Sequence, residues 1–215
     1  DCLLSRGLGD VYKRQALDVP LIHYSTDYVF DGSKPTAYDE DDVPNPLGVY
    51  GRSKLAGEQA IAAVGGKHLI LRTSWVYSLH GRNFLLTMQR LLQEREQLSV
   101  VADQIGAPTW AGSIAAATGQ LIDRWQTAQT AAWGVYHFTA RGETSWFGFT
   151  EAIATQLLAQ GKPVAQLTAI ATREYPTPAQ RPLNSRLDCT RLERDWGVSL
   201  PDWHDGLLQC LNSPR

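Results

Sequence analysis

Long apolar runs, a net basic charge and paired cysteines are all missing from this sequence of 215 residues. No uninterrupted apolar stretch reaches the roughly 18 residues of a membrane-spanning helix, so no membrane partner is expected. The formal charge of −2 provides no general attraction for phosphate backbones, which argues against a nucleic-acid partner. Cys2, Cys189 and Cys210 lack C-x-x-C spacing, so we expect free thiols in a reducing, cytoplasmic compartment rather than disulfides or zinc.

A glycine-rich loop of the kind that binds dinucleotides is also missing. Gly7 and Gly9 give only G-L-G, with no strand before them and no third glycine at the required spacing. Residues 1–15 show neither strand alternation nor a helical stripe, and we interpret them as a foreign or disordered lead-in. The five histidines share no ligand spacing, so no metal site is predicted.

From residue 16 onward, strand-like and helix-like segments alternate. Apolar runs predict strands at 19–25, 68–72, 98–102 and 134–139, and helical spacing predicts helices at 48–64, 83–95, 112–125 and 147–159. This alternation predicts an α/β fold with a Rossmann-like, doubly wound, mostly parallel sheet that is incomplete at its N-terminus. After Pro163 the pattern turns irregular, and TREYPTPAQRPLNSRLDC, with three prolines and three arginines, suits a small substrate lobe. We therefore assign 16–145 to the Rossmann-like domain and 146–215 to a mixed substrate-binding region.

The most informative motif is Tyr50-x-x-x-Lys54, inside the predicted helix. Residues four apart lie on one face of a helix, so the ammonium of Lys54 can sit near the phenol of Tyr50. A free tyrosine has a pKa of about 10, and a nearby positive charge lowers that pKa toward the range of acid–base catalysis. Alone, the motif is weak, because this spacing also occurs by chance on solvated helix faces.

A strand-end threonine strengthens this interpretation. Ser25-Thr26-Asp27 ends an apolar strand, and ligands of open α/β sheets collect beyond the carboxyl ends of the strands. The Thr26 hydroxyl could polarise the carbonyl oxygen that Tyr50 would protonate. A plain helix cap or Asx turn is the structural alternative for this tripeptide.

These blocks resemble a known family. In order and spacing, HYSTDYVFDG, NPLGVYGRSKLAGE, LILRTSWVY, GRNFLLTM, VADQIGAPT and YPTPAQRPLNSRL are similar to extended short-chain dehydrogenase/reductases, and among them to the dTDP-4-dehydrorhamnose reductases. The resemblance covers residues 16 to about 207. It implies reduction of the 4-keto group of dTDP-4-dehydro-L-rhamnose to dTDP-L-rhamnose, a precursor of cell-surface polysaccharide, with hydride from NADPH.

The resemblance also implies roles for individual residues. Thr26, Tyr50 and Lys54 correspond to the family's catalytic residues, and Tyr50 and Lys54 would also meet the cofactor. Substrate contacts are implied for Asp27, Tyr28, Trp75, Asn83 and Arg181, with Asn184 as a further polar residue of the last block. Each has a structural alternative: Trp75 could belong to the core, Asn83 could only cap its helix, and the arginines could be solvated.

The sequence also departs from the family. The family's first strand and G-x-x-G-x-x-G turn are not found here, so we expect the parent protein to be an active reductase and this chain alone to bind NADPH negligibly and to expose a strand edge. Some relatives hold magnesium through a glutamate just after the GAPT block. Here that stretch reads GAPTWAGS, so magnesium is not predicted.

Two other functions stay open. One is a sugar-nucleotide epimerase or dehydratase on the same scaffold, which would want a carboxylate such as Asp27 beside the threonine. The other is a non-catalytic, reductase-like regulatory subunit, against which the intact Tyr50 and Lys54 argue. The sequence does not define the oligomeric state, and a homodimer remains open.

Overall fold

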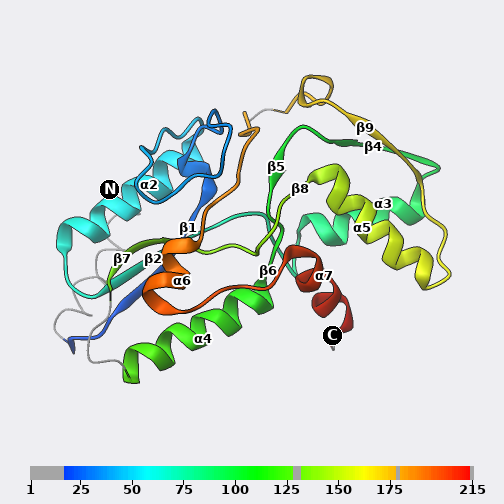
Figure 1. Cartoon of the computed structure of the whole chain (residues 1–215). Helices are drawn as coiled ribbons and strands as arrows, with labels where there is room; N and C mark the ends of the chain where they lie inside the picture. The colour runs from blue at the N-terminus through cyan, green and yellow to red at the C-terminus, as the bar shows by residue number, and fades with distance from the viewer. Residues whose placement is uncertain (1–16, 128–131, 178–179, 214–215) are drawn as a thin grey trace.

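The computed structural model describes residues 17–127, 132–177 and 180–213. Its main sheet has three parallel strands in the order β1-β2-β7 (Figure 1): β1 (Leu21–Thr26), β2 (His68–Thr73) and β7 (Gly134–His137). Thr26 is in register with Thr73, so the carboxyl ends of β1 and β2 finish side by side. The predicted parallel sheet is confirmed, and in the described part of the chain β1 forms its outer edge.

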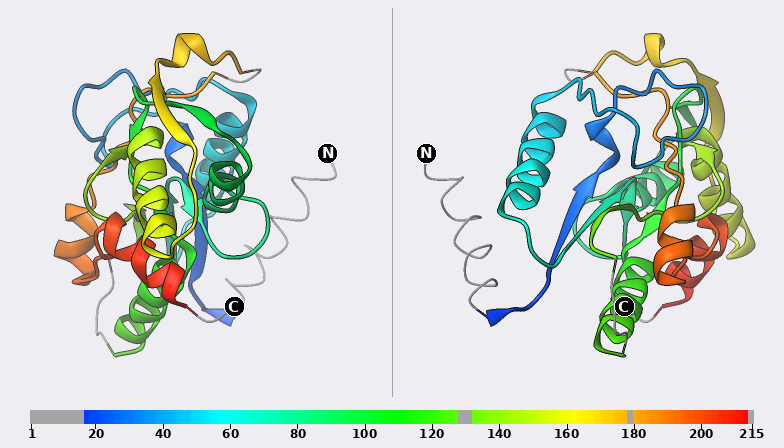
Figure 2. Two further views of the ribbon diagram at one scale, coloured as in Figure 1. Left: turned by 90° about the vertical axis from the view of Figure 1, so that its right-hand side faces the viewer. Right: turned by 60° about the vertical axis from the view of Figure 1, so that its left-hand side comes forward.

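Helices cover both faces of this sheet, as Figure 2 shows. On one face lies α2 (Val49–Val64), whose Ile61 packs against Ile70. On the other lie α4 (Ala111–Thr127) and α6 (Thr190–Trp196), whose apolar side chains pack against Leu69 and Leu71. The doubly wound arrangement is therefore confirmed.

Two glycines determine where α2 ends and how closely its first turn approaches β1. The helix stops at Gly65, which has a φ of +71° that favours glycine, and the predicted helix 48–64 ends at the same point. A Cβ on Gly51 would lie 2.1 Å from the carbonyl oxygen of Tyr28. Gly51 therefore lets the first turn of α2 lie directly on the backbone that follows β1.

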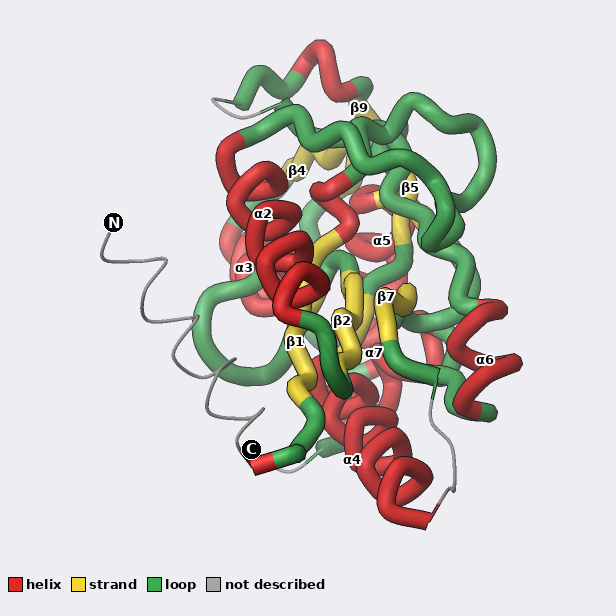
Figure 3. Tube along the Cα trace, turned by 90° about the vertical axis from the view of Figure 1, so that its left-hand side faces the viewer, coloured by secondary structure: helices red, strands yellow, loops and turns green. Residues whose placement is uncertain are grey.

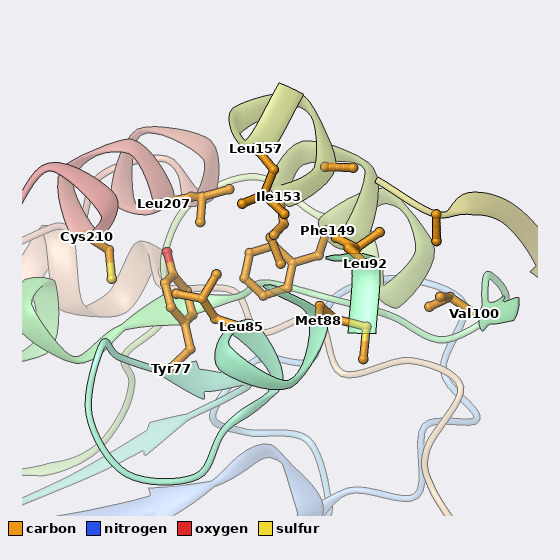
Figure 4. Packing of buried hydrophobic residues seen from close by; sticks show 12 residues of the cluster. Tyr77, Leu85, Met88, Leu92, Val100, Phe149, Ile153, Leu157, Leu207 and Cys210 are labelled. Carbon is orange, nitrogen blue, oxygen red and sulfur yellow. The ribbon is translucent and has the colours of Figure 1, made fainter. Parts of the chain in front are cut away.

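A second group of elements has its own core (Figure 4). The parallel pair β4 (Gln97–Val101) and β9 (Gln166–Ile170) packs with α3 (Phe84–Glu94), α5 (Trp146–Ala159) and α7 (Trp203–Asn212). Its fully buried residues include Leu85, Phe149, Ile153 and Leu207. Short strands link the two groups: β3 (Val76–Tyr77) with β6 (Thr109–Trp110), and β5 (Ile105–Gly106) with β8 (Thr144–Ser145).

The irregularity predicted after Pro163 is confirmed for residues 175–177 and 180–189, which form loops with isolated bridges, but it does not hold for the rest of that segment. That segment contains β9, the 3-10 turn η2 (Thr172–Glu174), α6 and α7. Leu192 and Trp196 of α6 enter the core of the main sheet, whereas Leu207 of α7 enters the core around Phe149. The elements are short, so their few apolar residues show little periodicity and the contacts with distant segments determine the structure. The division between residues 145 and 146 stays a prediction, since residues from both sides of it share both cores.

None of the helices described is long and apolar enough to cross a membrane.

Candidate active site

Thr26 closes β1 and caps the 3-10 turn η1 (Asp27–Val29). Its hydroxyl donates to Oδ1 of Asp27 at 3.0 Å and accepts from the backbone N–H of Tyr28 at 3.2 Å. The side chain is buried, so the turn itself fixes the direction of the hydroxyl. The cap that was the structural alternative is thus present, and a cap of this kind does not exclude contact with a ligand.

Tyr50 stands in the first turn of α2 and is 57% exposed. Its ring lies edge-on to the ring of Tyr28, with centroids 5.9 Å apart at an interplanar angle of 74°. Tyr28 follows Thr26 by two residues, so the helix brings the Tyr50 phenol to the end of β1. Figure 3 shows α2 running beside this strand.

Lys54 turns toward β1 rather than toward solvent. Its Nζ donates to the carbonyl oxygen of Tyr24 at 2.6 Å and lies 3.4 Å from Nε2 of His23. Burial lowers the pKa of Lys54, and the carboxylate of Glu58, one turn further along α2, raises it. No direct hydrogen bond between Lys54 and the Tyr50 hydroxyl is found among the described residues, so any effect of Lys54 on that phenol acts through space.

Asp27 is almost completely buried, and its Oδ2 has no hydrogen-bond partner among the described residues. Burial raises the pKa of Asp27 to about 6, and hydrogen bonds from Ser185 and Thr26 oppose the rise. Burial also raises the pKa of Tyr28, Asp27 adds to that rise, and the positive charge of Arg181 opposes it. Arg181 therefore lies within electrostatic reach of the strand end.

A cavity of about 670 Å³ lies between α3, β4 and the segment that holds Arg181. Phe84, Met88, Leu91 and Trp146 supply apolar surface, while Arg95 and Arg181 supply positive charge. An apolar wall with a few convergent cations suits a ligand with one flat ring and one anionic end.

Trp75 packs behind the cavity wall, against Trp146, which lines the cavity. Its ring stacks on Trp146, with centroids 3.6 Å apart at 9°, and its backbone φ is +48°, in the left-handed region. A Cβ on Gly106 would lie 2.7 Å from the Trp75 ring, so only glycine permits this packing. The structure thus holds a strained tryptophan against a cavity-lining tryptophan, an arrangement found at functional sites more often than in ordinary cores.

Asn83 caps α3, and its side chain is fully occupied. Its Oδ1 accepts from the N–H of Leu86 at 3.2 Å, while Nδ2 donates to the carbonyl oxygens of Ser78 and His80. These bonds support the capping alternative. Substrate contact at Asn83 stays a prediction.

Asn184 and Arg186 have a structural task. The amide of Asn184 donates to the carbonyl oxygens of Lys34 and Thr36, both at 2.7 Å, and its Oδ1 accepts from Arg186. Arg186 also donates to the carbonyl oxygen of Pro35 and lies near Glu143. This segment ties the loop that follows η1 to the C-terminal part of the chain, three residues after Arg181.

Three residues of the site were not predicted from the sequence. Trp146 and Tyr175 line the cavity, and Gln104 accepts from Nε1 of Trp146 at 3.1 Å while donating to Thr172. No local signal identified them, because each comes from a different segment. Gln104 does lie within the quoted block VADQIGAPT, and Tyr175 opens the quoted block YPTPAQRPLNSRL.

His137, at the end of β7, gives a prediction for stability against pH. The ring is fully buried, and burial together with the charge of Arg72 lowers the pKa of His137 from 6.5 to about 3. The neutral ring therefore stabilises the fold above about pH 6.5, and this contribution is lost as the pH falls toward 3. We expect the melting temperature of His137→Gln to fall less on acidification than that of the wild type. The exposed His80→Gln is the control; equal slopes in wild type and His137→Gln would contradict the assignment.

Comparison with known proteins identifies the family of this chain. Residues 12–215 match the family described as the RmlD substrate binding domain. The dTDP-4-dehydrorhamnose reductase of Sinorhizobium fredii is 46% identical over 190 residues, which is 88% of this chain and 64% of the relative. The enzyme of the same name from Escherichia coli K12 is 45% identical, with 89% and 64% covered.

Solved structures agree. A dTDP-4-dehydrorhamnose reductase from Bacillus anthracis in complex with NADP is 36% identical, with a TM-score of 0.83 over 94% of this chain and 68% of that one. Its counterpart from Clostridium acetobutylicum is 33% identical, with a TM-score of 0.84 and the same coverage. The chain spans about 64% of the length of the curated relatives described above.

A parallel sheet with helices on both faces, and with polar residues gathered at its strand ends, defines a Rossmann-like α/β protein. Within that class, the chain belongs to the RmlD substrate-binding-domain family, the family that its sequence resembles.

Proposed function

We propose that this chain carries the substrate-binding and acid–base residues of an NADPH-dependent oxidoreductase that reduces dTDP-4-dehydro-L-rhamnose to dTDP-L-rhamnose. The observation that carries the proposal is the meeting of Tyr50, Lys54 and Thr26 at the end of β1. Arg181 connects this strand end with the aromatic cavity, because it lines the cavity and its charge acts on Tyr28. The similarity to reductases of that name supports the choice of substrate.

The chain's own residues supply the proton. Tyr50, exposed at the start of α2, delivers its phenolic proton to the substrate's carbonyl oxygen as that carbon is reduced. Lys54 contributes a fixed positive charge on the same helix face, which favours the phenolate that remains. Thr26 offers its hydroxyl to the same oxygen, which requires its proton to turn away from Asp27. A protonated Asp27 releases it, since the carboxyl then donates to Thr26 instead.

NADPH, when bound, supplies the hydride, and the residues present fit its nicotinamide ribose. An ammonium has three donors, of which Lys54 uses one on Tyr24 and directs another toward His23. A donor therefore remains for a ribose hydroxyl. Tyr50 stands one turn away with its hydroxyl group accessible.

The diphosphate would lie near Arg181 and the N-terminus of α3, and the thymine against the aromatic wall of the cavity. Arg181 can pair with phosphate oxygens in a bidentate way, and flat bases stack on aromatic rings such as Phe84 and Trp146. Asp27 and Tyr28, at the strand end, would contact the sugar. Homodimer formation stays open.

One observation favours the alternative function of an epimerase or dehydratase. The pKa of Asp27 is raised, which suits a carboxylate that exchanges protons. Its burial against Thr26 and Ser185 argues for a supporting position behind the threonine rather than for direct attack on the sugar. The product distinguishes the two functions, since only the reductase consumes NADPH in stoichiometric amount.

Binding of dTDP to this chain tests the cavity. We expect dTDP to quench tryptophan fluorescence, because Trp146 lines the cavity and Trp75 stacks on Trp146. Arg181→Gln should weaken binding by roughly tenfold or more, the value of a lost charge-assisted contact. The control is Arg124→Gln on α4, which should bind like the wild type. Unchanged affinity in Arg181→Gln would remove this arginine from the phosphate site.

A further inference from the structure

A buried ion pair joins α2, one helical turn after Lys54, to the neighbouring strand β2. Glu58 on α2 and Arg72 on β2 are exposed by only 3% and 4%. Arg72 Nε donates to both carboxylate oxygens of Glu58, at 3.0 and 3.2 Å, and Nη2 donates to Oε2 at 2.7 Å. This is the only ion pair of the described residues in which both side chains are exposed by less than a tenth.

The pair links α2 to the rest of the site. The Arg72 guanidinium lies 5.1 Å from the centroid of the Phe30 ring, which stacks on Tyr38. Tyr38 exchanges backbone hydrogen bonds with the segment around Leu187, which the Asn184 amide secures. One buried guanidinium therefore joins the helix of Tyr50 and Lys54 to the segment that carries Arg181.

Glu58 also acts on Lys54 through its charge. The two residues are four apart on α2 and so share a face of the helix. Burial lowers the pKa of both Lys54 and His23, and Glu58 raises both. The charge of Lys54 itself also lowers the pKa of His23. The titratable groups facing Lys54 are thus His23 from β1 and Glu58 from its own helix, with Tyr50 one turn before it.

We propose that Glu58 is a positioning residue for Lys54: anchored by Arg72, it fixes α2 on the sheet and places a negative charge one helical turn from the ammonium, which lies on β1. Its importance for turnover rests on the function proposed above for Lys54. The effect of Glu58 on Lys54 and His23 is independent of that function and can be measured without cofactor or substrate.

Nuclear magnetic resonance titration of the chain tests the proposal. Five lysines and five histidines give few enough signals to follow individually, and Lys54→Gln and His23→Gln assign the two of interest. In Glu58→Gln we expect both titration midpoints to fall, because a negative charge that favours the protonated forms is lost. The control is Glu94→Gln, which removes the exposed Glu94 partner of Arg90 and should move neither midpoint.

The sign of the change separates positioning from mere packing. If Glu58 only held the helix in place, Glu58→Gln would loosen α2, expose Lys54 and His23 to water and raise both midpoints. Raised or unmoved midpoints would overturn the proposal. Should Glu58→Gln fail to fold, Glu58→Gln/Arg72→Met removes the pair without leaving a buried unpaired charge, and the same fall is expected.

Discussion

Replacing Tyr50 with phenylalanine should reduce turnover by about a hundredfold or more, the lower part of the range for removing an acid–base group. The ring and its contact with Tyr28 would remain, so only the proton donor is lost. Turnover is measured as NADPH oxidation with dTDP-4-dehydro-L-rhamnose, after joining this chain to the glycine-rich cofactor segment of a relative.

Tyr24→Phe is the matched control for that measurement. Tyr24 lies on the same strand as Thr26, but its hydroxyl is bonded to Thr118 of α4 at 2.7 Å and is not directed at the site. Its loss should leave turnover within a few-fold of the wild type. A Tyr50→Phe protein as active as Tyr24→Phe would exclude Tyr50 as the proton donor.

Breaking the buried ion pair on the arginine side should have the largest effect on stability. Arg72→Gln leaves the Glu58 carboxylate buried without its partner, which typically costs about 3–5 kcal/mol of unfolding free energy. An exposed ion pair offers the comparison: Arg90→Gln breaks the pair with Glu94 on α3 and should cost less than about 1 kcal/mol. Urea unfolding measures how much unfolding free energy each variant loses. Equal losses would contradict the prediction that the buried pair of Arg72 stabilises the fold more than the exposed pair of Arg90.

Much of the fold could be predicted because its core elements are strongly patterned. The runs that form β1 and β2 are continuous and apolar, and Gly65 marks the end of α2. The segment after Pro163 was harder, since β9 is a strand only through its pairing with β4, residue by residue from Gln97 with Gln166. Local sequence carries no information about such a distant partner.

The candidate site, like the fold, could be predicted from the sequence only in part. Thr26, Tyr50 and Lys54 were predicted because their chemistry depends on spacing within one helix and on the end of one strand. Asn184 was noted only as a further polar residue of the last block. Its amide nitrogen holds two carbonyl oxygens of the loop that follows η1, a structural role that the sequence did not indicate. The cavity itself could not be predicted, since its wall combines residues from α3, β4, α5 and the segment near Arg181.

The most direct test is the reaction of dTDP-4-dehydro-L-rhamnose and NADPH on the fused protein, with the sugar product analysed by nuclear magnetic resonance. We predict dTDP-L-rhamnose in an amount equal to the NADPH oxidised, and a loss of both with Tyr50→Phe. A sugar nucleotide that keeps its 4-keto group, whether unchanged or epimerised, while NADPH is not consumed would contradict the reductase assignment.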